Sequence, residues 1–261
     1  VTPRKMLKDS NISLIVNLTV PNAHANVATR AVRSGKHVYN EKPLALTRTQ
    51  GKKLLSLAEK NDVRVGCAPD TFLGAGIQTC GKLIDDGAIG IPIGATAFMT
   101  SHGPEDWHPN PDFFYKIGGG PMFDMGPYYL TALISLLGPI KRVTGSARAS
   151  FPTRKITTKE RMGEIINVEI PTHVTGIMDF HSGAVASIIT SFDIWSAQLP
   201  RIEIYGSEGS ISVPDPNGFG GQVRIFRHDD REWKNVPLTH PYAENSRGLG
   251  VSDMVRAIGE K

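Results

Sequence analysis

Cysteine is scarce in this sequence, and long apolar runs are missing from it. Only Cys67 and Cys80 occur among 261 residues, so we expect neither a disulfide framework nor a metal site, and a reducing cytoplasm fits this usage. No run approaches the ~20 apolar residues of a membrane span, so we expect no membrane partner. Hydrophobic residues make up 40% of the chain and charged residues 21%. These proportions are typical of a globular protein with a packed core.

Massed positive charge is also lacking. The 29 Lys and Arg residues against 25 Asp and Glu give a formal net charge of +4, and the basic residues are scattered along the chain. A nucleic-acid-binding protein usually concentrates them on one face or helix. We therefore expect a small-molecule partner and no nucleic acid.

The common local motifs of nucleotide-binding and hydrolytic enzymes do not occur. The sequence contains no P-loop, no His-Glu-x-x-His and no Gly-x-Ser-x-Gly. It also contains no Gly-x-Gly-x-x-Gly, since Gly74-x-Gly76 continues to Thr79. The function must therefore be inferred from several weaker motifs and from their order along the chain.

Strands and helices alternate in the first quarter of the chain. Residues 12–20 are a nearly continuous apolar run, which is typical of a strand buried on both faces. A helix over 23–34 ends before Gly35, and a capping box from Thr47 to Gln50 opens the next. With strands at 36–39 and 63–68, this order predicts a βαβαβ unit with a parallel sheet.

The pattern changes after about residue 73. We expect helices over 75–86 and 124–137, and then alternating, β-rich segments to about residue 238. Such a run of strands predicts an α+β domain with antiparallel pairing. We therefore divide the chain into residues 1–73 and 74–261, with a last helix starting near Gly250.

Two segments follow the first two predicted strands, where ligands bind in a parallel sheet. Thr19 to His24 comes after the first, and Glu41-Lys42-Pro43 after the second. Proline favours extended backbone at Lys42, and an ammonium there could neutralise a developing alkoxide. The alternative is an exposed loop lysine beside a glutamate, which an isolated three-residue match favours.

A second group of residues comes after Gly118–Gly120. Asp124 and Tyr128 are four residues apart and would share one face of a helix. A carboxylate and a phenol so placed can act as an acid–base pair. The alternative is that Asp124 caps the helix and Tyr128 packs in the core.

An aromatic and polar loop precedes this helix. We take Trp107, His108 and Tyr115 as candidates to line a ligand pocket, with packing as an equal alternative. His173 lies in a predicted strand and is a fourth candidate, although a lone strand histidine is more often structural.

Taken in order, these pieces resemble the glucose–fructose oxidoreductase / inositol dehydrogenase family (Gfo/Idh/MocA). The resemblance extends from about residue 10 to 258, and it also includes Tyr205-Gly206-Ser207-Glu208-Gly209. It implies a Rossmann (parallel-sheet) domain followed by a domain with a large, mostly antiparallel open sheet. It also implies a homodimer or homotetramer through that sheet.

The resemblance further implies an oxidoreductase that uses NAD or NADP on a sugar, polyol or related cyclic alcohol. The residues it assigns to the cofactor are Thr19, Pro21, His24, Glu41, Lys42 and Pro43. It makes Lys42, Asp124 and Tyr128 the catalytic set, where many members have histidine at the position of Tyr128. An ammonium beside a phenol would favour loss of the phenol proton.

The family's opening segment, with Gly-x-Gly-x-x-Gly, has no counterpart here. We therefore expect residues 1–73 to be the second half of a Rossmann domain, with an unpaired sheet edge and weak dinucleotide binding. Two alternatives stay open: an NAD-dependent glycoside hydrolase of the same family, and a non-catalytic dimerising or ligand-sensing relative.

Overall fold

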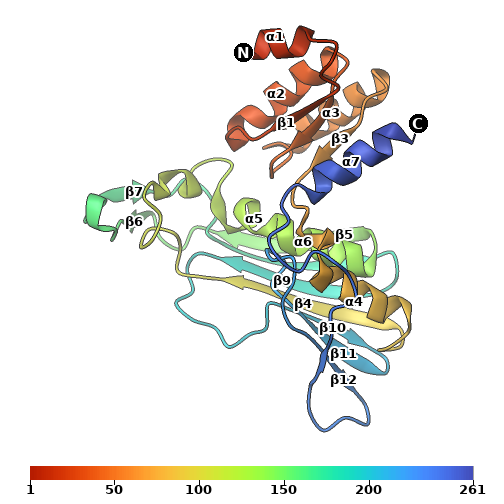
Figure 1. Cartoon of the computed structure of the whole chain (residues 1–261). Helices are drawn as coiled ribbons and strands as arrows, with labels where there is room; N and C mark the ends of the chain where they lie inside the picture. The colour runs from red at the N-terminus through yellow and green to blue at the C-terminus, as the bar shows by residue number, and fades with distance from the viewer. Residues whose placement is uncertain (261) are drawn as a thin grey trace. The chain divides into compact units, whose positions relative to one another are not determined.

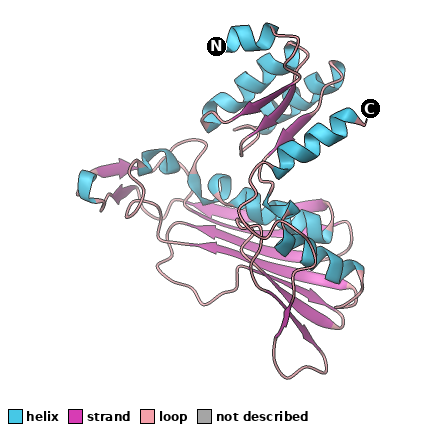
Figure 2. Ribbon diagram, viewed as in Figure 1, coloured by secondary structure: helices cyan, strands magenta, loops and turns pink. Residues whose placement is uncertain are grey.

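The computed structural model describes residues 1–260, which form two compact units. Unit 1 contains Val1–Asp70 together with the residues from Arg247 onward, and unit 2 is the continuous segment Thr71–Ser246. Figure 1 labels the elements along the chain and Figure 2 separates helices from strands. The last helix, assigned from sequence to the second domain, thus packs in unit 1. No helix within residues 1–260 has the length and apolar character needed to cross a membrane.

Unit 1 is built on a three-stranded parallel sheet in the order β1-β2-β3. Its elements are α1 (Pro3–Lys8), β1 (Leu14–Asn17), α2 (Pro21–Arg33), β2 (His37–Asn40), α3 (Arg48–Lys60), β3 (Val65–Cys67) and α7 (Leu249–Gly259). This order and pairing confirm the predicted parallel βαβαβ fold. β1 and β3 are shorter than the predicted strands over 12–20 and 63–68, whereas β2 has the predicted length of four residues, displaced by one.

Local signals set the helix ends of unit 1 as the sequence indicates. Pro21 starts α2, and Gly35, with φ of 70°, ends it. Thr47 Oγ1 accepts a hydrogen bond from the Gln50 amide at 3.2 Å and caps α3. Apolar side chains of the two helices then pack on the sheet: Ile15, Ala28, Ala31, Val32, Val38, Leu54 and Ala58.

The carboxylate of Asp70 holds the start of α7. Its Oδ2 accepts from the Gly248 amide at 2.8 Å and from the Gly250 amide at 3.1 Å. Amides at a helix N-terminus have no partner within the helix, so a carboxylate there stabilises it. The packing is close, because a Cβ at Gly66 would lie 3.1 Å from Met254 Sδ.

Unit 2 contains an eight-stranded sheet in the order β13-β12-β11-β10-β4-β9-β8-β5. All pairs are antiparallel except β4 with β9, which confirms the mostly antiparallel sheet. Its first elements are η1 (Thr71–Leu73), α4 (Ala75–Asp85), β4 (Pro92–Thr100), η2 (Pro111–Tyr115), α5 (Gly120–Asp124), α6 (Gly126–Leu137), β5 (Ile140–Arg148), β6 (Thr153–Lys155), η3 (Lys159–Arg161) and β7 (Ile165–Asn167). The others are β8 (His173–Phe180), β9 (Val185–Ser191), β10 (Ile202–Gly206), β11 (Gly209–Val213), β12 (Val223–Arg227) and β13 (Lys234–Val236).

The sheet of unit 2 has one apolar and one mostly polar face. One row of paired residues across six strands is apolar and buried: Met178, Ala186, Ala95, Ile204, Ile211 and Ile225. The neighbouring row carries Ile177, Ser187, Thr96, Glu203, Ser212 and Arg224. The helices α4, α5 and α6 pack on the apolar face (Figure 2).

Three details differ from the sequence prediction. The central strand β4 was not predicted, because glycine and alanine dominate its buried positions and give little hydrophobic signal. The predicted strand over 165–180 is two strands, β7 and β8, separated by a segment containing Pro171. The predicted helix over 124–137 is also divided, since α5 ends at Asp124 and α6 begins at Gly126.

Replacement of Gly206 should destabilise unit 2. A Cβ built there lies 2.1 Å from the Ile89 carbonyl oxygen, so the backbone must shift. We expect Gly206→Ala to lower the free energy of unfolding by about 1–3 kcal/mol, measured by urea denaturation. Gly81→Ala is the control, because Gly81 lies inside α4 and its Cβ would make only a 3.8 Å contact. A loss in the control equal to that in Gly206→Ala would contradict the assignment.

Candidate active site

The carboxyl ends of β1 and β2 are joined by a buried pair of amides. Asn17 and Asn40 are 2% and 0% exposed and lie opposite each other in the sheet. Asn17 Nδ2 donates to Asn40 Oδ1 at 2.8 Å, and Asn17 Oδ1 accepts from the Thr19 hydroxyl at 2.8 Å. These two asparagines were not among the predicted residues, although polar side chains at the end of an apolar run were a usable signal.

His24 connects the two predicted segments. It is 1% exposed on α2, with Nε2 2.7 Å from the Thr19 carbonyl oxygen and Nδ1 2.7 Å from that of Pro43. A carbonyl oxygen only accepts, so the ring donates through a nitrogen that carries a proton. The imidazole thereby ties the turn after β1 to the loop after β2. The structure thus brings Thr19, His24 and Pro43 together, with Pro21 opening the same helix.

The loop that carries Lys42 is fixed from both sides. The Lys42 amide donates to Glu41 Oε2 at 2.8 Å, and the Glu41 carbonyl faces Cys67 Sγ at 3.7 Å. The Lys42–Pro43 peptide is cis. Burial raises the pKa of the Cys67 thiol to about 12, and Glu41 adds to this shift. The thiol therefore stays protonated beside this loop.

Asp124 and Tyr128 lie in unit 2, on either side of the break between α5 and α6. Asp124 is the last residue of α5, and the residue at the N-cap of α6 is Met125. The predicted capping role of Asp124 is therefore wrong. Tyr128 is 7% exposed in the first turn of α6.

The four residues predicted to line a ligand pocket have different surroundings. Trp107 is 66% exposed and packs edge-on against His108 and Phe114. Tyr115 is fully buried and its hydroxyl donates to Glu105, so it has no surface to offer a ligand. His173 is half-buried, with Nδ1 2.9 Å from Ser191 Oγ. An aromatic loop does not distinguish lining from packing by its sequence alone.

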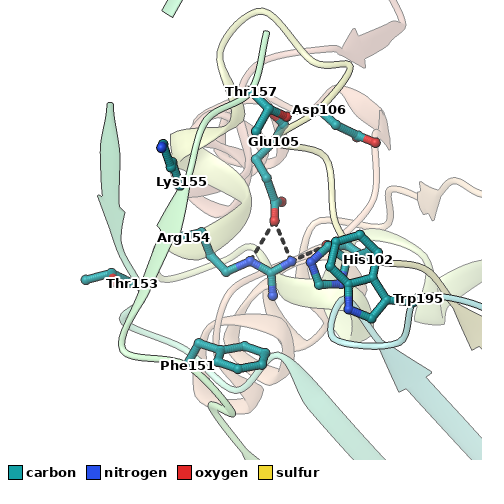
Figure 3. A pocket seen from close by; sticks show the side chains of 9 residues that line it. All are labelled: His102, Glu105, Asp106, Phe151, Thr153, Arg154, Lys155, Thr157 and Trp195. Atoms are coloured by element: carbon teal, nitrogen blue, oxygen red, sulfur yellow. Dashed lines mark hydrogen bonds and ion pairs between the residues drawn. The ribbon is translucent and has the colours of Figure 1, made fainter. Parts of the chain in front are cut away.

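A buried arginine organises the end of unit 2 that contains this loop (Figure 3). The side chain of Arg154 is 4% exposed. Its Nε donates to Glu105 at 2.6 Å, and Nη1 pairs with Asp193 at 2.9 Å. Nη2 donates to the carbonyls of His102 and Phe192. Sequence analysis missed Arg154, because it lies in the three-residue strand β6 and its partners are distant in sequence.

His102 stacks on Trp195 beside this arginine. The ring centroids are 3.3 Å apart and the planes differ by 11°. Burial lowers the pKa of His102 below its ordinary value, and the Arg154 cation lowers it further. The imidazole is therefore held in its neutral form.

With this geometry established, comparison with known proteins identifies the family. A family model described as the GFO/IDH/MocA C-terminal domain matches residues 77–212. A second, described as an oxidoreductase family with an NAD-binding Rossmann fold, matches residues 2–68. The chain belongs to the GFO/IDH/MocA oxidoreductase family. The Rossmann model matches the first part of the chain and the C-terminal-domain model the second part, which is the order predicted from the sequence.

Individual relatives are distant in sequence. The chain is 23% identical to myo-inositol 2-dehydrogenase of Thermotoga maritima over 80% of its length and 58% of the relative. It is 25% identical to levoglucosan dehydrogenase of Pseudarthrobacter phenanthrenivorans over 92% of its length and 66% of the relative. The chain therefore spans less than two thirds of either curated relative.

Solved structures share the fold. An NAD binding oxidoreductase from Klebsiella pneumoniae superposes with a TM-score of 0.76 at 22% identity, covering 98% of this chain and 71% of that one. Levoglucosan dehydrogenase in complex with NADH and L-sorbose gives 0.74 at 23% identity, covering 97% and 71%.

Removing the Arg154 cation should unfold unit 2 readily. Arg154→Met leaves Glu105 and Asp193 buried without their partner, so we expect a loss of about 3–5 kcal/mol in the free energy of unfolding. Urea denaturation measures it. Arg142→Met is the matched control: its ion pair with Asp179 has an arginine that is 74% exposed, and we expect a loss of about 1 kcal/mol or less. Equal losses would contradict the structural role of Arg154.

Acidification should weaken unit 2 through His102. Its folded-state pKa lies below 6.5, so below that pH the unfolded chain binds the proton more tightly and the free energy of unfolding falls. His102→Phe keeps a ring against Trp195 and removes the titration. We expect the variant to lose less stability than the native protein as pH decreases from 6.5. Their stability curves should run parallel above neutral pH, and identical slopes below 6.5 would refute the prediction.

Proposed function

We propose that this chain is part of an NAD(P)-dependent oxidoreductase that transfers a hydride between a nicotinamide cofactor and a sugar, polyol or related cyclic alcohol. The observation that carries the proposal is the carboxyl edge of the parallel sheet in unit 1. There, the Asn17–Asn40 pair and His24 hold the Thr19 turn and the Glu41–Pro43 loop in one place. Ligands bind at this edge in open parallel sheets.

Named relatives support the substrate class. The matched curated proteins include a myo-inositol 2-dehydrogenase, a D-xylose dehydrogenase and a levoglucosan dehydrogenase. All three act on polyhydroxylated rings or sugars by name. We transfer this class to the present chain as part of the proposal.

The residues at the sheet edge fit the nicotinamide end of a dinucleotide. Thr19, Pro21, His24, Glu41, Lys42 and Pro43 are the residues we assign to it. They offer hydroxyl, carbonyl and ammonium groups. The N-terminus of α2 beside them has no side-chain cap, and such a helix end favours a negatively charged group. When bound, the nicotinamide accepts or gives the hydride. The cofactor is NAD or NADP.

We assign the proton chemistry to three side chains. The Lys42 ammonium stabilises negative charge on the substrate oxygen. Tyr128 holds or releases the hydroxyl proton, and the carboxylate of Asp124 orients the substrate or assists this transfer. Trp107, His108 and His173 remain candidates for substrate contacts. In this proposal residues 1–73 bind the nucleotide and residues 74–261 bind substrate.

Lys42→Met should slow turnover of a sugar or polyol by about a hundredfold or more, because the charge that stabilises the substrate oxygen is lost. Steady-state kinetics of the whole oxidoreductase with NAD or NADP measure kcat. Calorimetry of the same protein should find the dinucleotide affinity largely unchanged. Lys60→Met, at the exposed end of α3, is the control. Near-normal turnover in Lys42→Met would remove this lysine from the mechanism.

We also propose that copies of the chain assemble through the open face of the large sheet, as a homodimer or homotetramer. Ile177 and Val185 lie on this face in adjacent strands and are 50% and 47% exposed. Burying such side chains against a second copy is favourable.

Charges on this face should dissociate the assembly. Ile177→Lys combined with Val185→Lys would place ammonium groups inside the interface, so we expect the mass by light scattering to decrease to that of one chain. Ile165→Lys, at a 60% exposed position in β7, should keep the native mass. A native mass in the double variant, or a single-chain mass in the native protein, would exclude this interface.

A cytoplasmic location completes the proposal. It is supported by the cysteine usage, since Cys67 and Cys80 are both free thiols, as expected of a reducing compartment.

A further inference from the structure

The large sheet of unit 2 ends in a long strand whose outer side is unpaired. Within the part of the chain that the structure describes, β5 pairs only with β8 and is the last strand at one edge of the sheet (Figure 1). Every residue from Lys141 to Arg148 is exposed. Since strand residues direct their backbone groups alternately to one side and the other, about half of those in β5 face outward. Such a row of amides and carbonyls can pair with an added strand.

The edge at β5 has little of the protection that is usual in proteins. Natural edge strands are short, or contain proline, a bulge or inward-pointing charges. The opposite edge strand, β13, has only three residues. In β5 a bulge places the extra residue Lys141 at the start of the strand. The remaining residues, from Arg142 to Arg148, pair with β8 in continuous register and include no proline. This segment is therefore available for pairing on its outer side.

The side chains of β5 differ between the two faces of the sheet. Val143 pairs with the buried Met178, so the odd-numbered residues lie on the face that the helices cover. Val143 is nevertheless 68% exposed, and the other two are a glycine and an alanine. The even-numbered residues lie on the open face, with Arg142 and Arg148 at the ends and hydroxyl side chains between them. One face of this edge is therefore small and apolar, and the other is basic.

The positive charge at this edge is only partly neutralised. Arg142 Nε donates to Asp179 Oδ2 at 2.6 Å, in a pair whose arginine is 74% exposed. Lys141 and Arg148 form no ion pair with any residue that the structure describes. A second β5 paired antiparallel about Gly145 would place Arg142 of one copy opposite Arg148 of the other. Like charges directly opposite destabilise a sheet, so the charges disfavour a second copy and favour an acidic strand.

We propose that the outer edge of β5 binds an extended acidic peptide segment of another protein, which adds an antiparallel strand to the large sheet. Main-chain hydrogen bonds to β5 hold the segment. Two carboxylates, spaced as Arg142 and Arg148 are, pair with these arginines on the open face. Bulky apolar side chains between them cover Gly145 and its small neighbours on the other face. This site depends neither on the proposed oxidoreductase activity nor on the proposed assembly of copies.

Fluorescence anisotropy with a labelled synthetic peptide tests the proposal. The probe is Glu-Ile-Thr-Phe-Thr-Val-Glu, in which carboxylates and apolar residues alternate as the two faces of β5 require. We expect saturable binding to the native chain, and binding about tenfold weaker when both glutamates are lysine. Arg148→Glu should weaken binding of the acidic peptide about tenfold and strengthen that of the basic one. Lys159→Glu, at an exposed position in η3, makes the same change in net charge and should alter neither.

Methylated peptides separate strand addition from charge attraction alone. N-methyl groups on one alternate set of peptide amides should abolish binding, and those on the other set should not, because only one set faces β5. Absence of saturable binding, equal effects of the two sets, or equal binding of the acidic and basic peptides to the native chain would overturn the proposal. Light scattering tests the other occupant: a native mass that Arg148→Glu changes would assign this edge to a second copy of the chain and exclude the peptide.

Discussion

The hydrogen bond between Asn17 Nδ2 and Asn40 Oδ1, 2.8 Å long, joins the carboxyl ends of β1 and β2 in unit 1. Amides this deeply buried must find partners inside the protein, because an unsatisfied one costs about 1–3 kcal/mol. Their remaining groups reach outward, to the Thr19 hydroxyl, the His24 carbonyl and the Leu44 carbonyl. One pair of side chains therefore fixes both loops that follow the strands.

In unit 2, buried charged side chains connect separate loops as the two buried amides do in unit 1. Arg154 gathers Glu105 and Asp193 from different loops, and Thr172 donates to the second oxygen of Asp193 at 2.7 Å. Removal of one member of such a buried cluster leaves a charge without its partner, which is costly. Arg154 also donates to the carbonyl of His102, whose ring stacks on Trp195.

Features that depend on a few neighbouring residues could be predicted from the sequence, whereas features that depend on contacts between distant residues could not. Thr47 and Gly35 mark helix ends because capping and positive φ are properties of a few neighbouring residues. Strand β4 could not be predicted from its neighbouring residues, because it pairs with β9 and β10, which lie about a hundred residues away in the sequence. Its small residues are buried only because the partner strands are there.

The candidate site shows the same division. Lys42 and its neighbours could be found because they follow directly from a strand end. His24 could be identified only as one member of a family motif, and its two carbonyl contacts required the fold. The cluster around Arg154 could not be predicted from the sequence, because its members come from strand β6 and from two separate loops that only the fold of unit 2 brings together.

The carboxylate of Asp70 has a topological consequence. It receives the amide of Gly248 at 2.8 Å, so the chain leaves unit 1 and returns to it within one hydrogen bond of the same place. Unit 2 is thus an insertion that is continuous in sequence. The two chain segments that lead into it and out of it lie side by side at Asp70 and Gly248. All three strands of unit 1 therefore precede unit 2 in the sequence, whereas α7 can join unit 1 only after the whole of unit 2 has been synthesised.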